Sequence, residues 1–159
     1  MSSRGGAQSS ALCPPPLNVK EDCSINADSQ SEVKEWLNRA RSDLRAAKVD
    51  LAADPPLIED ALFHCQQASE KVLKGFLTFH GKPFEKTHDL DRLAQVCEGI
   101  LPALAAVLKP VRPLTIFAWK FRYPGPSESP PLKEAKDALT ATIKAVERIR
   151  SALPKVLGG

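Results

Sequence analysis

The sequence has few of the residue arrangements that carry catalysis, metal binding or membrane insertion. It contains 4 cysteines, and none of them stands in the C-x-x-C spacing that is typical of a zinc site. It has no run of about 18 apolar residues, so we expect no membrane span. No secretory signal is visible, which favours a cytoplasmic protein. No glycine-rich phosphate loop and no nucleophile–base–carboxylate set is present, and we expect neither a metal nor a cofactor.

The composition is that of a globular protein with one domain. Hydrophobic residues make up 43% of the 159 residues and charged residues 26%. The formal net charge of +3 is too small to indicate a nucleic-acid partner without a focused basic patch. Residues 1–30 are rich in Ser, Gly, Ala and Pro, and we expect them to form a flexible tail. Residues 31–157 are then expected to form the helical domain.

Most of the chain shows the periodicity of amphipathic helices. Between residues 61 and 80 the apolar residues fall on one broad helix face, because an α-helix turns roughly 100° per residue. Gly81 is expected to end this central helix as its C-terminal cap. The predicted buried face of the central helix consists of Ala61, Leu62, Cys65, Ala68, Ser69, Val72, Leu73, Phe76 and Phe79.

The remaining helices follow from the same spacing. They are expected over residues 31–52, 87–98 and 131–153, with Ser31 and Thr87 as N-caps of the first two. Residues 101–123 contain prolines that predict a kinked or restarted helix. Short connections favour antiparallel neighbours. The sequence therefore predicts an all-α fold, an up-and-down bundle of four main helices with a short fifth helix.

The first candidate site is a polar stripe on the central helix. Cations that are spaced along one helix face can contact successive phosphates. The same pattern is also typical of an ordinary solvated helix face, and the sequence leaves both interpretations open. The stripe consists of His64, Gln67, Lys71 and Lys74.

The second candidate site is Arg122 with Tyr123, at a sharp helix end before Pro124. An arginine beside an aromatic ring can hold a phosphate while the ring stacks on a base. Alternatively, Arg122 binds helix-end carbonyls or a carboxylate, and Tyr123 packs under the following loop.

Three further residues are candidates for a functional role. His88 lies in a Thr-His-Asp turn, where it could act in acid–base chemistry or simply belong to a helix start. Phe63 and Leu77 lie at the edge of the polar side of the central helix, where a lone bundle would leave them partly exposed. We expect these two to contribute to an interface with a second protein.

Three stretches, ALFHCQQASEKVLKGFL (61–77), THDL (87–90) and FRYPG (121–125), together resemble the HEPN family, the higher eukaryotes and prokaryotes nucleotide-binding domain. The resemblance covers about residues 32–153. It implies a helical bundle that commonly forms a homodimer. Small prokaryotic members often act with a minimal nucleotidyltransferase, in many cases as toxin and antitoxin.

The chain departs from the ribonucleases of this family. In those members an arginine is followed after a short spacer by a histidine, and two copies meet across the dimer to form the site that cuts RNA. Arg122 matches the arginine by position, but Ser127, Glu128 and Ser129 occupy the places of the histidine. No histidine follows His88, so the usual acid–base partner for the ribose 2′-hydroxyl is missing.

The resemblance therefore implies a non-catalytic HEPN-like protein. We expect a dimeric module that binds a nucleotide, RNA or a minimal nucleotidyltransferase. One alternative is a divergent, metal-independent ribonuclease toxin that uses Arg122 with His88 or His64. Another is a purely structural interaction domain with Phe63 and Leu77 in its interface.

Overall fold

The fold is a helical bundle with one helix at its centre. The computed structural model describes residues 25–125 and 128–157, and every regular element in this part of the chain is helical, which confirms the all-α prediction. The elements are α1 (Ala27–Ala52), α2 (Ile58–Phe79), α3 (Leu90–Ile100), η1 (Pro102–Leu104), α4 (Ala105–Leu108), η2 (Arg112–Ala118), α5 (Leu132–Ser151) and η3 (Lys155–Leu157), where η marks a 3₁₀ helix. Of the helices described here, none is long and apolar enough to cross a membrane.

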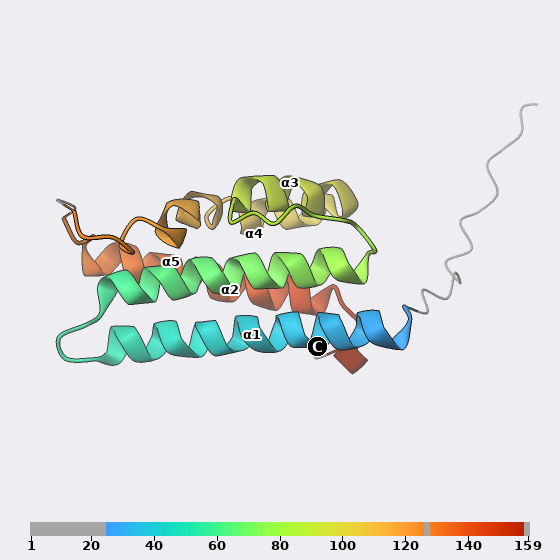
Figure 1. Ribbon diagram of the computed structural model, residues 1–159, viewed down its shortest axis with the longest axis horizontal. Helices are drawn as coiled ribbons and strands as arrows, with labels where there is room; N and C mark the ends of the chain where they lie inside the picture. Colours follow the sequence, from blue (N-terminus) through green and yellow to red (C-terminus); the bar gives the residue numbers. More distant parts are fainter. Residues whose placement is uncertain (1–24, 126–127, 158–159) are drawn as a thin grey trace, which may run out of the picture.

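The three long helices lie side by side, and α2 packs against both α1 and α5 (Figure 1). The helices α1 and α2 run antiparallel, as short connections favour. The short elements α3 and η2 pack on the side of α2 that faces away from α1. In this arrangement α2 is surrounded on most of its circumference, which explains its high content of buried residues.

Helix α1 begins at Ala27, earlier than the expected start at Ser31. The cap is Asn26, whose side-chain oxygen accepts a hydrogen bond of 2.7 Å from the backbone N–H of Ser29. Residues 27–30 of the expected tail therefore belong to the helix. Residues 1–24 lie outside the part of the chain that the structure describes.

Helix α3 begins at Leu90 and is capped by Asp89 rather than by Thr87. The Asp89 carboxylate accepts a hydrogen bond of 2.9 Å from the backbone N–H of Asp91. The Thr87 hydroxyl oxygen instead accepts from the N–H of Asp89 at 3.0 Å. Thr87 thus stabilises the turn before the helix, in which Asp89 is the N-cap. The sequence spacing alone does not distinguish this role from capping.

The expected cap of α2 at Gly81 is confirmed. Gly81 has a φ of 60°, a left-handed conformation that is costly for residues with a Cβ atom. The N–H of Lys82 donates to the carbonyl of Leu77 at 2.9 Å, and that of Gly81 donates to Thr78 at 3.1 Å. This pair of bonds is the Schellman motif, which satisfies the last carbonyls of the helix.

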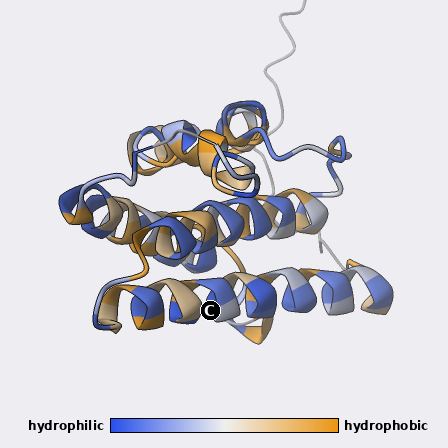
Figure 2. Ribbon diagram, turned by 60° about the vertical axis from the view of Figure 1, so that its left-hand side comes forward, coloured by the Kyte–Doolittle hydropathy of each residue, from blue (hydrophilic) through white to orange (hydrophobic). Residues whose placement is uncertain are grey.

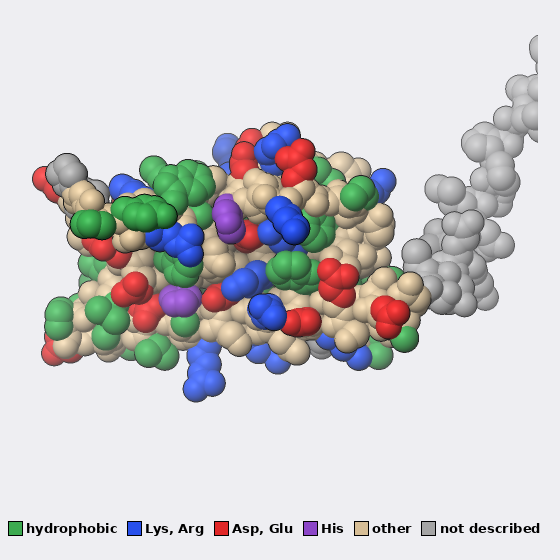
Figure 3. Space-filling model, in the orientation of Figure 1, with side chains coloured by type: hydrophobic (Ala, Val, Ile, Leu, Met, Phe, Trp, Pro, Cys, Tyr) green, Lys and Arg blue, Asp and Glu red, His purple; other side chains and the backbone are tan. Residues whose placement is uncertain are grey.

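The long helices turn their apolar sides toward one another (Figure 2). Their outer sides carry acidic and basic side chains that are interspersed along α1 and α2 (Figure 3). This division is what buries the apolar stripes that the sequence predicts.

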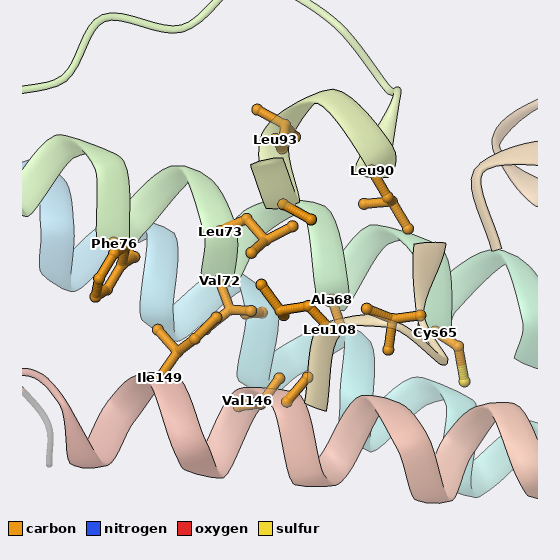
Figure 4. Packing of buried hydrophobic residues seen from close by; sticks show 14 of the residues in the cluster. Cys65, Ala68, Val72, Leu73, Phe76, Leu90, Leu93, Leu108, Val146 and Ile149 are labelled. Carbon is orange, nitrogen blue, oxygen red and sulfur yellow. The ribbon is translucent and has the colours of Figure 1, made fainter. Parts of the chain in front are cut away.

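The core forms where α2 meets α1, α3, α4 and α5, and Figure 4 shows part of it. Leu73 and Phe76 of α2 are at most 1% exposed. They lie among Leu90 and Leu93 of α3, Leu108 of α4, and Val146 and Ile149 of α5. The predicted buried face of α2 is thereby confirmed, with Phe79 half-buried at its end.

The thiols of Cys65 and Cys97 are also enclosed, and burial raises the pKa of each to about 12.

A glycine allows α1 to approach α2 closely. A Cβ atom at Gly75 would lie 3.1 Å from the Cβ of Trp36 and 3.6 Å from Leu37. Contacts of 3.1 Å between such carbons are tighter than ordinary packing, so the absence of a side chain at Gly75 sets the distance between the helices here.

The region from 101 to 123 is more broken than the expected kinked or restarted helix. Its regular structure is limited to η1, α4 and η2, with Pro110 and Pro113 between or within the pieces. Two side chains fasten η2 to α3 instead. Arg112 forms ion pairs with Asp91 at 2.7 Å and Glu98 at 2.6 Å, and Thr115 accepts from the N–H of Leu90 at 2.9 Å. The hydrogen bond between Arg112 and Glu98 is the main reason that the pKa of Arg112 is raised.

The prediction that Leu77 is exposed is wrong, because Leu77 is 0% exposed. It continues a second buried face of α2 that runs through Gln66, Glu70 and Lys74 at the spacing of helical neighbours. The segment 81–89 crosses this face. Periodicity does not reveal that segment's position, because it is not itself a helix.

Candidate functional site

Two members of the polar stripe on α2, Lys71 and His64, face carboxylates of α1. Lys71 forms an ion pair with Asp43, and the Nδ1 of His64 lies 3.3 Å from the other oxygen of the same carboxylate. The Nε2 of His64 lies 3.9 Å from Asp50. Burial is the main reason that the pKa of Asp50 is raised. Lys71 and His64 are therefore held in the seam between two helices rather than free on a solvated face.

Further along α2, a buried carboxylate organises the Glu70 cluster, which we define as Gln66, Glu70, Lys74 and His88. Glu70 is 4% exposed. It accepts from Lys74 at 2.7 Å and from Gln66 at 2.9 Å, and it lies 2.9 Å from the Nδ1 of His88. Gln66 also donates to the backbone carbonyl of His88 at 3.3 Å. The cluster thus ties the segment 81–89 onto α2.

Lys74 is enclosed by this arrangement. Its Nζ lies 5.7 Å from the ring centroid of Trp36 and 5.8 Å from that of Phe84, close enough for cation–π attraction. Gln67, the remaining member of the stripe, donates to the side-chain oxygen of Gln66 at 2.7 Å. Lys71 and Lys74 thus already face the carboxylates of Asp43 and Glu70. That His64, Gln67, Lys71 and Lys74 form a row of phosphate contacts stays a prediction.

Arg122 lies in a different environment, beyond the end of η2. Its guanidinium carbon lies 5.8 Å from the ring centroid of Phe63 on α2, and the side chain is exposed. Among residues 25–125 and 128–157, no carboxylate lies within ion-pair distance of Arg122. The alternative in which Arg122 serves a carboxylate is therefore not what the structure contains.

Arg122 borders a shallow hollow, which we call the Arg122 depression. Its volume is about 240 Å³. Phe117 and Phe121 stack with ring centroids 5.9 Å apart and planes inclined by 11°. Acidic residues of the first turn of α2 complete the rim, where they also suit the positive end of the helix dipole. The lining consists of Glu59, Asp60, Phe63, Phe117, Phe121 and Arg122.

Apolar groups extend outward from the depression. Tyr123 is 79% exposed, so it does not pack under the following loop. Ile116 of η2 is 44% exposed, and Trp119, which directly follows η2, is 50% exposed. Figure 3 shows hydrophobic side chains gathered over η2 and the segment that follows it. Such a concentration of exposed apolar surface is typical of an interaction site.

The structure unites part of the predicted site and separates the rest. Arg122 lies over the ring of Phe63. The ring of His64 contacts Phe63 edge-on, with ring centroids 5.5 Å apart. Lys71, Lys74 and His88 belong instead to the carboxylates of Asp43 and Glu70. Ser127 lies outside the described residues, and Glu128 and Ser129 are exposed.

Sequence reasoning missed four residues of the depression. Glu59 and Asp60 precede the expected start of the central helix at Ala61, but α2 begins at Ile58 and includes them. Phe117 and Phe121 are four residues apart, a helical spacing that is typical of core residues, and only their proximity to Arg122 in the sequence could have suggested a second role. No group of three or more His, Cys, Asp or Glu in the described part of the chain could hold a metal ion.

The pKa of Glu70 gives the protein a testable acid sensitivity. Burial alone raises this pKa, but hydrogen bonds from Lys74, His88 and Gln66 outweigh burial and hold it below the ordinary value of 4.5. A depressed pKa stabilises the folded state above the unfolded pKa, and this contribution disappears as the pH falls through the folded pKa.

We predict that Glu70→Gln lowers the free energy of unfolding at pH 7 by about 3 kcal/mol, because Lys74 keeps its burial and loses its counter-charge. Urea unfolding measures this difference, which should shrink steadily below about pH 4.5 as the wild-type carboxylate takes up a proton. Glu35→Gln on the exposed side of α1 is the matched control, with an expected change below about 0.5 kcal/mol. A difference that stays constant from pH 7 to pH 3 would show that charge is not the cause.

Comparison with models of protein families gives a match. A model of the HEPN domain matches residues 33–156, which is most of the chain. No curated protein matches, and no solved structure matches.

Proposed function

The chain belongs to the HEPN domain family, and we propose that it is a non-catalytic member of this family of nucleotide-binding and ribonuclease-like modules. In this proposal it is a cytoplasmic homodimer that binds a nucleotide or RNA and acts with a minimal nucleotidyltransferase in a toxin–antitoxin-like pair. The observation that carries the binding role is Arg122, an exposed guanidinium over an aromatic ring that forms no ion pair with any carboxylate of the described residues. The nucleotidyltransferase partner follows from the family resemblance.

The Arg122 depression offers each kind of group that a nucleotide needs. Arg122 supplies charge-assisted hydrogen bonds to a phosphate. The rings of Phe63 and Tyr123 supply faces on which a base can stack. The carboxylates of Glu59 and Asp60 can accept hydrogen bonds from ribose hydroxyls or an exocyclic amine. These carboxylates disfavour a second phosphate near the α2 end of the depression, so the proposed ligand is oriented with its phosphate at Arg122.

The size of the depression supports a dimer. At about 240 Å³ it is smaller than the roughly 300–1,000 Å³ of a typical small-molecule site. A second copy that packed on Trp119 and Ile116 would deepen it. The adjoining surface also holds both signs of charge, with Lys120 beside Glu134 and Asp137. A two-fold interface requires such self-complementarity, because the same patch faces itself.

The missing histidine supports the non-catalytic part of the proposal. Arg122 alone can bind a phosphodiester, but it cannot remove the proton of a ribose 2′-hydroxyl at neutral pH. Lys71 and Lys74 do not replace this function, because carboxylates neutralise both.

A specific observation favours a ribonuclease as the second candidate. The Nδ1 of His88 lies 2.9 Å from the buried carboxylate of Glu70, while the His88 side chain is 59% exposed. A carboxylate in this position orients an imidazole and leaves its other nitrogen available as a base. His64 is less suited, because it lies between Asp43 and Asp50. This candidate requires RNA cleavage that His88→Ala abolishes without unfolding the protein.

We predict that Arg122→Ala removes ligand binding without loss of the fold. ATP, GTP or a short RNA at 100 times its dissociation constant should stabilise the wild type by about 2.7 kcal/mol and raise its melting midpoint. The same ligand should leave the midpoint of Arg122→Ala unchanged. Arg39→Ala, which removes an exposed arginine of α1, is the control and should respond as the wild type does. Equal shifts in all three proteins would place the ligand elsewhere.

We also predict that Trp119→Glu separates the dimer. A central interface tryptophan contributes about 2 kcal/mol or more, so the dimer dissociation constant should rise at least about 30-fold. Sedimentation equilibrium measures this constant directly. Val49→Glu changes a side chain of α1 that is 62% exposed and serves as the control, with no expected effect. A wild type that stays monomeric at high concentration would contradict the proposed dimer.

A further inference from the structure

In the described part of the chain, a row of cations on α1 forms no ion pair. Arg41, Arg45 and Lys48 are exposed and recur at the spacing of one helix face over about 10 Å. In the residues that the structure describes, none of the three lies within ion-pair distance of an acid. By contrast, the neighbouring Arg39 is paired with Glu35. The positive charge of α1 is thus concentrated on one side.

This row borders a groove between α1 and α5, which we call the α1–α5 groove. Its volume is about 320 Å³, and Glu147 is the one acidic residue among its lining residues. The floor is apolar and consists of the edges of Leu37 and Leu44 from α1 and of Ile143 and Val146 from α5. The complete lining is Leu37, Arg41, Leu44, Arg45, Lys48, Ile143, Val146, Glu147 and Arg150.

We propose that the α1–α5 groove binds an acidic amphipathic helix of a partner protein. A helix that lies along two others places its apolar ridge in the groove between them. Its flanking carboxylates would then face Arg41, Arg45 and Lys48. The lining from Leu37 to Lys48 covers three turns of α1, so a helix segment of about 11 residues matches its length.

The composition of the groove argues against RNA as its occupant. Sites for single-stranded nucleic acid combine positive charge with aromatic rings on which bases stack. No aromatic residue belongs to the lining of the α1–α5 groove, whereas aromatic rings are abundant at the Arg122 depression. An apolar floor also gives a phosphate backbone nothing to contact.

A second copy of this chain is disfavoured as well, because two such grooves facing one another would bring their cations together. The groove is separate from the proposed dimer surface. Ala138 and Ala141 border that surface, and rotation of roughly 100° per residue puts them on nearly the opposite side of α5 from Glu147 and Arg150. The groove would therefore stay open in a dimer, and its role does not depend on the Arg122 proposal.

The test uses the full chain and a fluorescein-labelled peptide of 18 residues, with leucines at helical three- and four-residue spacing and glutamates on the other face. Fluorescence anisotropy should show saturable binding by the wild type that weakens with salt. The double variant Arg41→Glu/Arg45→Glu should bind at least tenfold more weakly, and so should Ile143→Asn. Arg39→Glu/Arg92→Glu makes the same change of charge elsewhere and should bind as the wild type does.

A second peptide of the same composition, with its leucines scattered so that no apolar face forms, should bind at least tenfold more weakly to the wild type. Equal binding of both peptides would overturn the proposal, because only charge would then be recognised. It is also overturned if the first peptide fails to bind, or if Arg41→Glu/Arg45→Glu weakens binding of an oligouridine while leaving peptide binding intact. Circular dichroism confirms that each variant is folded.

Discussion

The buried carboxylate of Glu70 is the charge on which the arrangement of the chain between α2 and η2 depends. A carboxylate that is 4% exposed must be balanced, and Lys74, Gln66 and His88 supply the necessary donors. Because His88 belongs to the segment after α2, satisfying Glu70 lays that segment across α2 and places the start of α3. Helix α3 in turn holds η2 through Arg112 and Thr115. The position of Arg122, just beyond η2, thus depends on a series of polar contacts that starts inside α2.

The cations of the protein fall into two groups with different consequences. Lys71, Lys74 and Arg112 form ion pairs with carboxylates of the protein and so hold its segments together. Arg122 and the row on α1 have no such partner among the described residues, so their charge is available to a ligand or a protein. Arg122 and the row on α1 lie on separate surfaces. Aromatic rings surround Arg122, whereas the row on α1 borders a groove with an aliphatic floor. The same kind of charge therefore supports two different recognition chemistries, because its neighbours differ.

How far the sequence predicts the structure depends on the range of the interaction. The helices, the cap at Gly81 and the buried face around Leu73 follow from spacing and local chemistry. The burial of Leu77 and the pairing of Lys71 with Asp43 do not, because they require knowledge of which segments pack on α2. Prolines between 101 and 123 correctly predicted an interruption, but its length depends on the support that Arg112 gives. Arg122 was found by its motif, whereas Glu59 and Asp60 join it only through the packing of η2 on α2.

The most direct test of the account is an RNA cleavage assay of the purified full chain in the presence of EDTA, with a short single-stranded RNA followed by gel electrophoresis. The account predicts that the RNA is bound and stays intact, because Arg122 has no histidine at the expected spacing to act as its acid–base partner. Cleavage that is lost in both Arg122→Ala and His88→Ala, with both variants folded, would contradict it. The protein would then be a ribonuclease in which the histidine held by Glu70 performs the missing step.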